Sequence, residues 1–154
     1  MKKIFLIPLL LSLAGCATPM AVSMKKQDSA IIRHDPKMAQ VYFYRDKAFT
    51  GVLRGIYIDI DDVRVGALNS GTYFTQDVQP GTHKFSVEDW LGKENPSRSL
   101  NVKAGEKYYL KGGMQMGFWD AQTTISISAK EEGEAAIQGL DYEVTSSEAT
   151  QSKN

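Results

Sequence analysis

Two histidines, His34 and His83, are the first candidates for chemistry in this chain, because imidazole is the commonest general base in enzymes. His83 follows the Pro80-Gly81 turn at the start of a predicted strand, whereas His34 stands in a segment without apolar periodicity. A nucleophilic triad also needs a held serine or cysteine, and the Gly-x-Ser-x-Gly pattern is absent. We predict that His83 packs beside the turn and that the chain is not an enzyme. A hydrolase is the least favoured alternative.

Three carboxylates, Asp59, Asp61 and Asp62, fall within four residues and could supply oxygen ligands to Ca²⁺. The glycine and the distal glutamate of a calcium-binding loop are missing from this stretch. On a strand, Asp59 and Asp61 would share one face while Asp62 turns away. We therefore predict a polar strand face that ends in a tight hairpin turn at Asp61-Asp62, with no metal and no cofactor.

Met114 and Met116 carry thioethers that suit Cu(I). Glycines surround them, and methionine commonly fills gaps beside aromatic side chains. We predict that they pack in the core or a loop. If the stretch is exposed instead, it becomes an apolar contact patch together with Trp119.

Aromatic side chains on a sheet can build a core, stack on sugar rings or anchor an interface. Tyr57 and Tyr109 alternate with neighbours that are predicted to point inward, so we expect both to face outward. The predicted interaction surface comprises Tyr57, Tyr109, Met114, Met116 and Trp119. Arg45, after an apolar strand, is predicted to be an ordinary strand-end charge, with an ion pair to Asp59 or Glu106 as the alternative.

Cys16, the single cysteine, ends the run Leu13-Ala14-Gly15-Cys16. Lys2, Lys3 and a short apolar stretch precede it, which is the order of a secretory signal peptide over residues 1–15. The pattern resembles the lipobox of bacterial lipoproteins. That resemblance implies cleavage before Cys16 and acylation of its sulfur and its new amine, palmitate being a typical chain. Three chains of roughly a dozen methylenes each would contribute on the order of 30 kcal/mol to membrane binding.

Location follows from the same resemblance. Residue 17 is alanine, whereas an aspartate there tends to retain lipoproteins in the inner membrane. We therefore expect an anchor in the outer membrane, with the protein facing the periplasm. The 18 basic residues include the two lysines of the leader and are matched by 18 acidic ones, so no basic stripe suggests nucleic acid as a partner.

The rest of the chain must position these residues. Residues 16–38 lack sustained periodicity and are predicted to form the lipidated cysteine and a flexible tether. Residues 39–140 carry short alternating runs with turn signals about every ten residues, which predicts an all-β domain: an antiparallel β-sandwich of about seven to eight strands. One short C-terminal helix is expected within residues 129–140, although Gly133 weakens it. Residues 141–154 are predicted to be a disordered tail.

Several short stretches, in this order behind the lipobox, resemble a family of small bacterial lipoprotein domains of unknown function: 41–45, 79–83, 105–110, 116–118 and 131–133. The resemblance implies an extracytoplasmic β-sandwich and supplies no catalytic residues. We expect a protein-interaction or assembly-support module without catalysis, held to the membrane by its lipid and binding an envelope protein. A module that binds glycan or peptidoglycan is the alternative.

Overall fold

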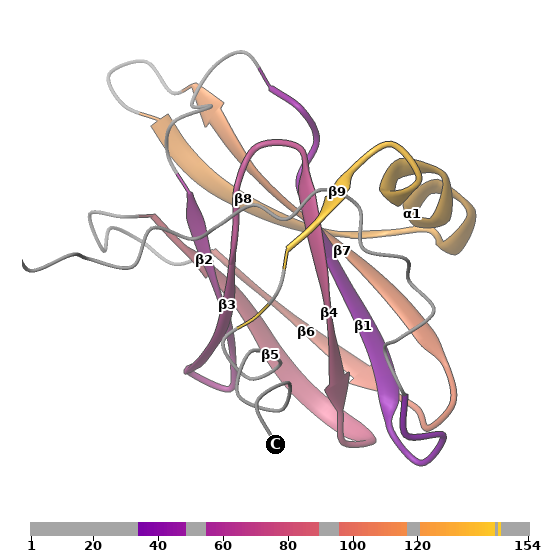
Figure 1. Ribbon diagram of the computed structural model, residues 1–154. Coiled ribbons are helices and arrows are strands. Elements are labelled where there is room, and N and C mark those ends of the chain that lie inside the picture. Colours follow the sequence, from indigo (N-terminus) through magenta and orange to yellow (C-terminus); the bar gives the residue numbers. More distant parts are fainter. Residues whose placement is uncertain (1–33, 49–54, 90–95, 117–120, 144, 146–154) are drawn as a thin grey trace, which may run out of the picture.

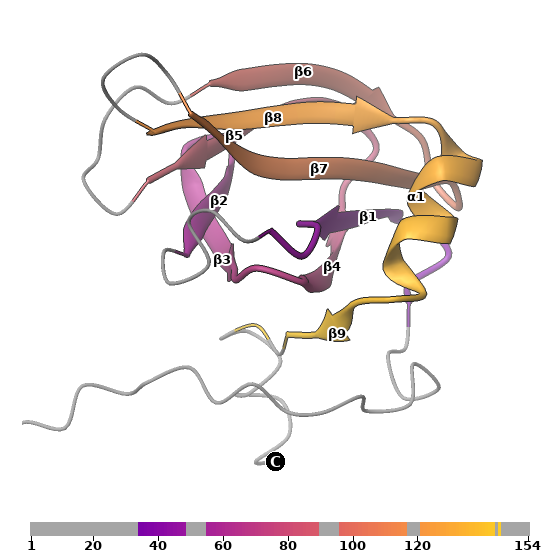
Figure 2. The same cartoon turned by 90° about the horizontal axis from the view of Figure 1, so that it is seen from above.

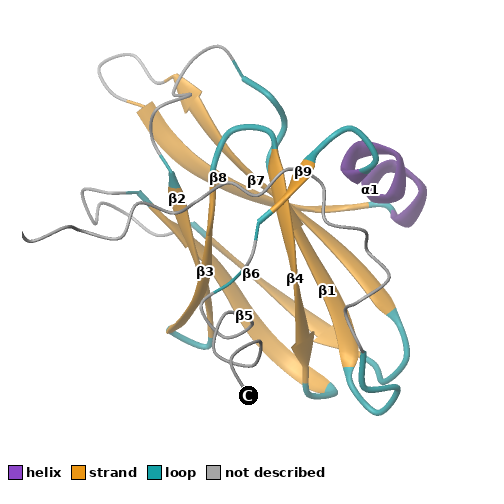
Figure 3. Cartoon of the chain, in the orientation of Figure 1, coloured by secondary structure: helices purple, strands orange, loops and turns teal. Residues whose placement is uncertain are grey.

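The computed structural model describes residues 34–48, 55–89, 96–116, 121–143 and 145. Nine strands in two sheets and one short helix make up this part of the chain, in a sandwich-like arrangement that confirms the mostly β prediction (Figures 1 and 3). The elements are β1 (Ala39–Tyr44), β2 (Ile56–Ile60), β3 (Val63–Leu68), β4 (Thr72–Val78), β5 (Gly81–Glu88), β6 (Ser97–Val102), β7 (Lys107–Met116), β8 (Ala121–Ser128), α1 (Lys130–Ile137) and β9 (Asp141–Tyr142).

The first sheet has the strand order β8-β7-β1-β4-β9, and the second has the order β3-β2-β5-β6. Most neighbouring strands are antiparallel, as predicted, but β1 pairs parallel with β7 and β4 pairs parallel with β9. Alternation of apolar residues reports which face of a strand is buried, but it says nothing about the direction of the neighbouring strand.

The core fills the space between the two sheets. Phe43 of β1 stacks on Phe74 of β4 with ring centroids 5.1 Å apart, and it reaches Phe85 of β5 in the opposite sheet at 6.0 Å. All three side chains are fully buried, and the isoleucines of β2 join them. The alternation predicted for β2 therefore has its apolar side facing inward, as expected.

Glycines allow the sheets to approach each other. A Cβ on Gly66 of β3 would stand 2.8 Å from the Phe74 ring, and one on Gly112 of β7 would stand 2.7 Å from Ile56. Each glycine therefore leaves room for a large side chain of the opposite sheet.

A second aromatic layer covers the outer face of the first sheet. Tyr42 stacks on Tyr109 across the β1–β7 pairing, and Tyr73 meets Tyr142 edge to face. Helix α1 lies over this face beside β7 (Figure 2), with Gly133 seated on the Tyr109 ring. Gly133 is the buried residue of α1, so the glycine that weakened the helix prediction is the one at its contact with the sheet.

Both predicted boundaries of the domain need correction. Asp141–Tyr142 forms β9 where a disordered tail was expected, and Glu143 holds the turn before β4 through Asn69 and Thr72. At the other end, Asp35 to Met38 form a turn closed by the Met38 N–H on the Asp35 carbonyl at 2.9 Å. Residues 34–38, which the prediction assigned to the tether, therefore adjoin the folded domain. Residues 1–33, with Cys16, lie outside the described residues.

Candidate ligand-binding site

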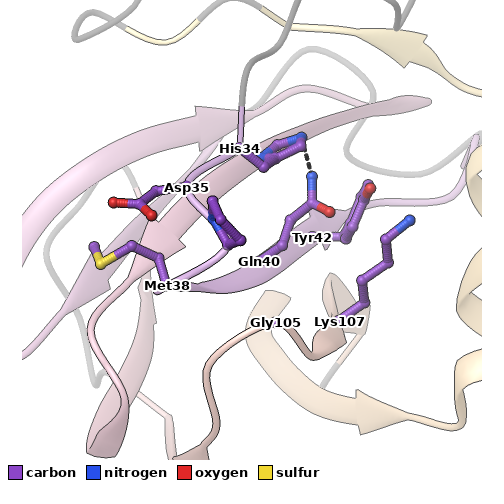
Figure 4. Close-up of a pocket in the computed structure, with 8 residues that line it drawn as sticks. His34, Asp35, Met38, Gln40, Tyr42, Gly105 and Lys107 are labelled. Atoms are coloured by element: carbon purple, nitrogen blue, oxygen red, sulfur yellow. Dashed lines mark hydrogen bonds between the residues drawn. The ribbon is translucent and has the colours of Figure 1, made fainter.

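An open pocket of about 510 Å³ lies where the chain enters β1, on the outer face of the first sheet (Figure 4). Its lining comes from the segment before β1, from β1 itself, from the turn before β7 and from the first residue of β7: His34, Asp35, Pro36, Met38, Gln40, Tyr42, Gly105 and Lys107. Gln40 and Lys107 are direct partners in the parallel β1–β7 register. The parallel pairing therefore creates this site by placing two polar strand positions side by side.

Asp77 of β4 fixes one wall of the pocket. Its carboxylate meets His34 Nδ1 at 3.0 Å and accepts the Asp35 N–H at 3.1 Å. The side-chain amide nitrogen of Gln40 can only donate, so His34 Nε2 accepts from it in the contact dashed in Figure 4, and Nδ1 donates to Asp77. These bonds hold both His34 and Gln40 in place.

The floor of the pocket is the half-buried ring of Tyr42. Tyr109 stacks against it with centroids 4.8 Å apart, and the Lys107 ammonium lies 5.8 Å from its centroid, within the range of a cation–π interaction. Burial, followed by the nearby Tyr73, Glu134 and Asp77, raises the pKa of Tyr42. The phenol is therefore a neutral hydroxyl at physiological pH.

His83 serves as a structural clamp in a different place. Its Nε2 donates to the Gln79 carbonyl at 2.8 Å, and its Nδ1 lies 2.6 Å from the Asp61 carboxylate. A carbonyl can only accept, so both ring nitrogens carry protons when the pair is formed, and the hydrogen bond to Asp61 raises the pKa of His83. Neither nitrogen is then available as a base, and His83 does not line the pocket described above.

The three clustered aspartates bind three different cationic side chains. Asp59 accepts from Arg64 at 2.8 Å, and Asp62 meets Lys84 at 2.6 Å, while Asp61 holds His83. Asp61 and Asp62 have φ values of 50° and 66°, the signature of a two-residue hairpin turn, so the predicted turn is confirmed. Within the described ranges, no three His, Cys, Asp or Glu side chains are grouped closely enough to hold a metal ion.

The predicted interaction surface does not come together as one patch. Tyr57 is 37% exposed on the outer face of the second sheet, where Arg64 covers its ring at 4.2 Å. Tyr109 faces away from the core as expected, but the prediction that it is exposed is wrong, because α1 leaves it only 2% exposed. Met114 is half-buried against the core. Met116 lies in β7, but its side chain is outside the described residues, as is Trp119.

Arg45 is buried at 2% exposure, so the prediction of an ordinary strand-end charge is wrong. Its guanidinium donates to the Leu68 carbonyl of the opposite sheet at 3.4 Å. Burial lowers the pKa of Arg45. Glu106, the suggested partner, lies at the other end of β1, where its carbonyl accepts from Gln40 N–H. Asp59, the other suggested partner, pairs with Arg64.

Sequence reasoning missed the pocket. Gln40, Tyr42 and Lys107 are ordinary residues in their own strands, and only the parallel register joins them. The alternation of Gln40 and Tyr42 with the buried Val41 and Phe43 signalled a shared outer face, but it gave no partner strand.

The described residues form a two-sheet β domain with an open pocket at the start of β1. Residues 35–125 match the profile of a family described as protein of unknown function (DUF2846), and the chain belongs to this family. An uncharacterized protein of Haemophilus influenzae is 27% identical over 142 residues, which cover 91% of this chain and 83% of the relative. Across the described ranges, no helix has the length and apolarity needed to cross a bilayer.

Proposed function

We infer that this chain is a non-catalytic protein-interaction module, lipid-anchored through Cys16 in the outer membrane and facing the periplasm. The observation that carries the interaction role is edge strand β8. Its eight residues include no charge and no proline, and four of them are β-branched. Ile127 is 44% exposed, and Ser126 beside it is exposed as well. An edge of this composition is suited to pairing with an extended segment of another protein.

The other sheet edges in the described part of the chain are protected by familiar devices. Strand β3 has a bulge opposite Ile58 and Asp59 and carries Arg64, β9 has two residues, and β6 carries Arg98. Strand β8 lies near β6 in Figure 2, but the two belong to different sheets and are not hydrogen-bonded neighbours. The second edge of β8 therefore has no strand paired with it among the described residues. The partner we propose is an extended, uncharged and β-branched-rich segment of an envelope protein, because such a segment adds to β8 without burying a charge.

Envelope cross-linking tests the interaction. Full-length protein is purified from cross-linked cells as the parent, as the Ser126→Lys/Ile127→Lys variant and as Ser99→Lys, which places a lysine on the exposed face of β6. We expect a repeated partner that is lost from the β8 variant and retained by Ser99→Lys, because added lysines block strand addition. The same proteins captured by all three forms would refute the proposal.

Membrane fractionation tests the anchor separately. Parent protein should sediment with the outer membrane and need detergent for release, whereas Cys16→Ser should leave the acylated species absent from mass spectra of the N-terminus. An unacylated N-terminus in the parent would remove the anchor without bearing on β8.

A further inference from the structure

The pocket at the start of β1 combines three recognition elements within one small volume. Lys107 supplies a positive charge, Gln40 supplies a polar acceptor and Tyr42 supplies an aromatic surface. Its volume of about 510 Å³ falls in the range of small-molecule sites. Figure 4 shows the Lys107 and Gln40 side chains on either side of the Tyr42 ring.

The charge of Lys107 is not neutralised by its surroundings. Among the described residues, no carboxylate lies within ion-pair distance of Lys107, and its one recorded interaction is with the Tyr42 ring. Lys111, two positions further along the same face of β7, is paired with Asp46 at 2.5 Å. The Asp35 carboxylate also lines the pocket, but it lies beyond ion-pair distance of Lys107, so the ammonium remains able to attract an anionic group of a ligand.

The hydrogen bonds that hold Gln40 and His34 leave the side-chain oxygen of Gln40 as the polar acceptor of the pocket. Gln40 is only 7% exposed, and its amide nitrogen is used on His34. The side-chain oxygen of Gln40 accepts no hydrogen bond from the described residues. Every fully buried side-chain oxygen among these residues has a partner, so this unpartnered oxygen is in contact with the solvent of the pocket. This oxygen and the neutral Tyr42 hydroxyl suit a ligand that carries hydroxyl groups.

We propose that this pocket binds a carboxylated sugar. The carboxylate pairs with Lys107, a ring hydroxyl donates to the Gln40 oxygen, and the apolar face of the sugar packs against the Tyr42 ring. A neutral sugar lacks the charge, and a simple carboxylate lacks the ring, so each satisfies only part of the site.

Ligand-observed NMR with full-length protein in detergent micelles tests this assignment. The probes are glucuronate, glucose and acetate. We expect a millimolar dissociation constant for glucuronate and at least fivefold weaker binding of the other two. Lys107→Met should reduce glucuronate binding to the level of glucose, and Lys111→Met is the matched control that should leave it unchanged. Tyr42→Phe keeps the ring and should retain most of the affinity.

Equal binding of all three probes, or equal loss in Lys107→Met and Lys111→Met, would overturn the proposal. Sedimentation with peptidoglycan strands stripped of their stem peptides, which frees the carboxylate of the muramic sugar, then distinguishes two sources of such a sugar. Sedimentation that is lost in Lys107→Met indicates a cell-wall polymer, whereas glucuronate binding without sedimentation indicates a soluble sugar acid. No residue of β8 lines the pocket, so this proposal is independent of the β8 interaction. The Ser126→Lys/Ile127→Lys variant should therefore bind glucuronate as the parent does.

Discussion

Gly133 lies inside α1, at the point where the helix backbone rests on Tyr109, and Gly133→Ala tests how this helix is held. In a solvent-exposed helix the change would raise stability by about 1 kcal/mol. Here the new Cβ would stand 2.2 Å from Tyr109 Cγ and 2.4 Å from its Cβ. Tyr109 is 2% exposed and stacked on Tyr42, so it has little room to yield. The helix must instead move outward by about 1 Å to restore ordinary contact.

The destabilisation from the close contact can be compared with the gain in helix propensity of Gly133→Ala. Overpacking of this kind costs about 1–3 kcal/mol, and the outward shift also weakens the 3.3 Å hydrogen bond from Tyr109 to Glu134, about 1 kcal/mol more. After the helix-propensity gain, we expect a net loss of about 1–3 kcal/mol. For a domain of roughly 100 residues this lowers Tm by about 5–15 °C.

Thermal and urea unfolding of the full chain measure this loss. Gly139→Ala is the matched control, because a Cβ there meets nothing within 4 Å and its φ is not positive. It should leave stability unchanged or raise it by about 0.5 kcal/mol. Ala135→Gly, on the exposed side of α1, calibrates helix propensity. If Gly133→Ala is as stable as the parent, the packing argument for α1 is refuted.

Two further predictions concern the clamp at His83 and the close approach of the sheets. Asp61 raises the pKa of His83 above its ordinary value of 6.5. While Asp61 stays ionised, the stability that the pair contributes is complete below pH 6.5 and is lost as the pH rises through the folded-state pKa of His83. Urea titrations should show this decline in the parent and not in His83→Gln, and an equal decline in both would exclude His83 as its source. Gly66→Ala would place a Cβ 2.8 Å from the Phe74 ring and should cost about 1–3 kcal/mol in the same unfolding assay, whereas a loss no larger than that of Gly139→Ala would contradict the tight sheet contact.

Most of the strands could be predicted from local pattern. The alternation over 56–60 and the Asp61-Asp62 turn lie where the sequence predicts them, and β5 begins at Gly81, directly after Pro80. The exposure of Tyr109 could not be predicted in the same way. The alternation of side chains along β7 correctly assigned Tyr109 to the outer face of the sheet. The helix that covers this face lies more than twenty residues away in the chain, so its contact with Tyr109 could not be predicted.

The sequence by itself determined most of the strands, the Asp61-Asp62 turn and the class of fold, because side-chain alternation and turn chemistry act over a few neighbouring residues. It also carries the run Leu13-Ala14-Gly15-Cys16, on which the proposed anchor rests. Only the tertiary structure decided that β1 lies parallel to β7, that Gln40 meets Lys107, and that Gly133 presses on Tyr109. These contacts join segments distant in the chain, and the packing of one sheet face against another element selects them.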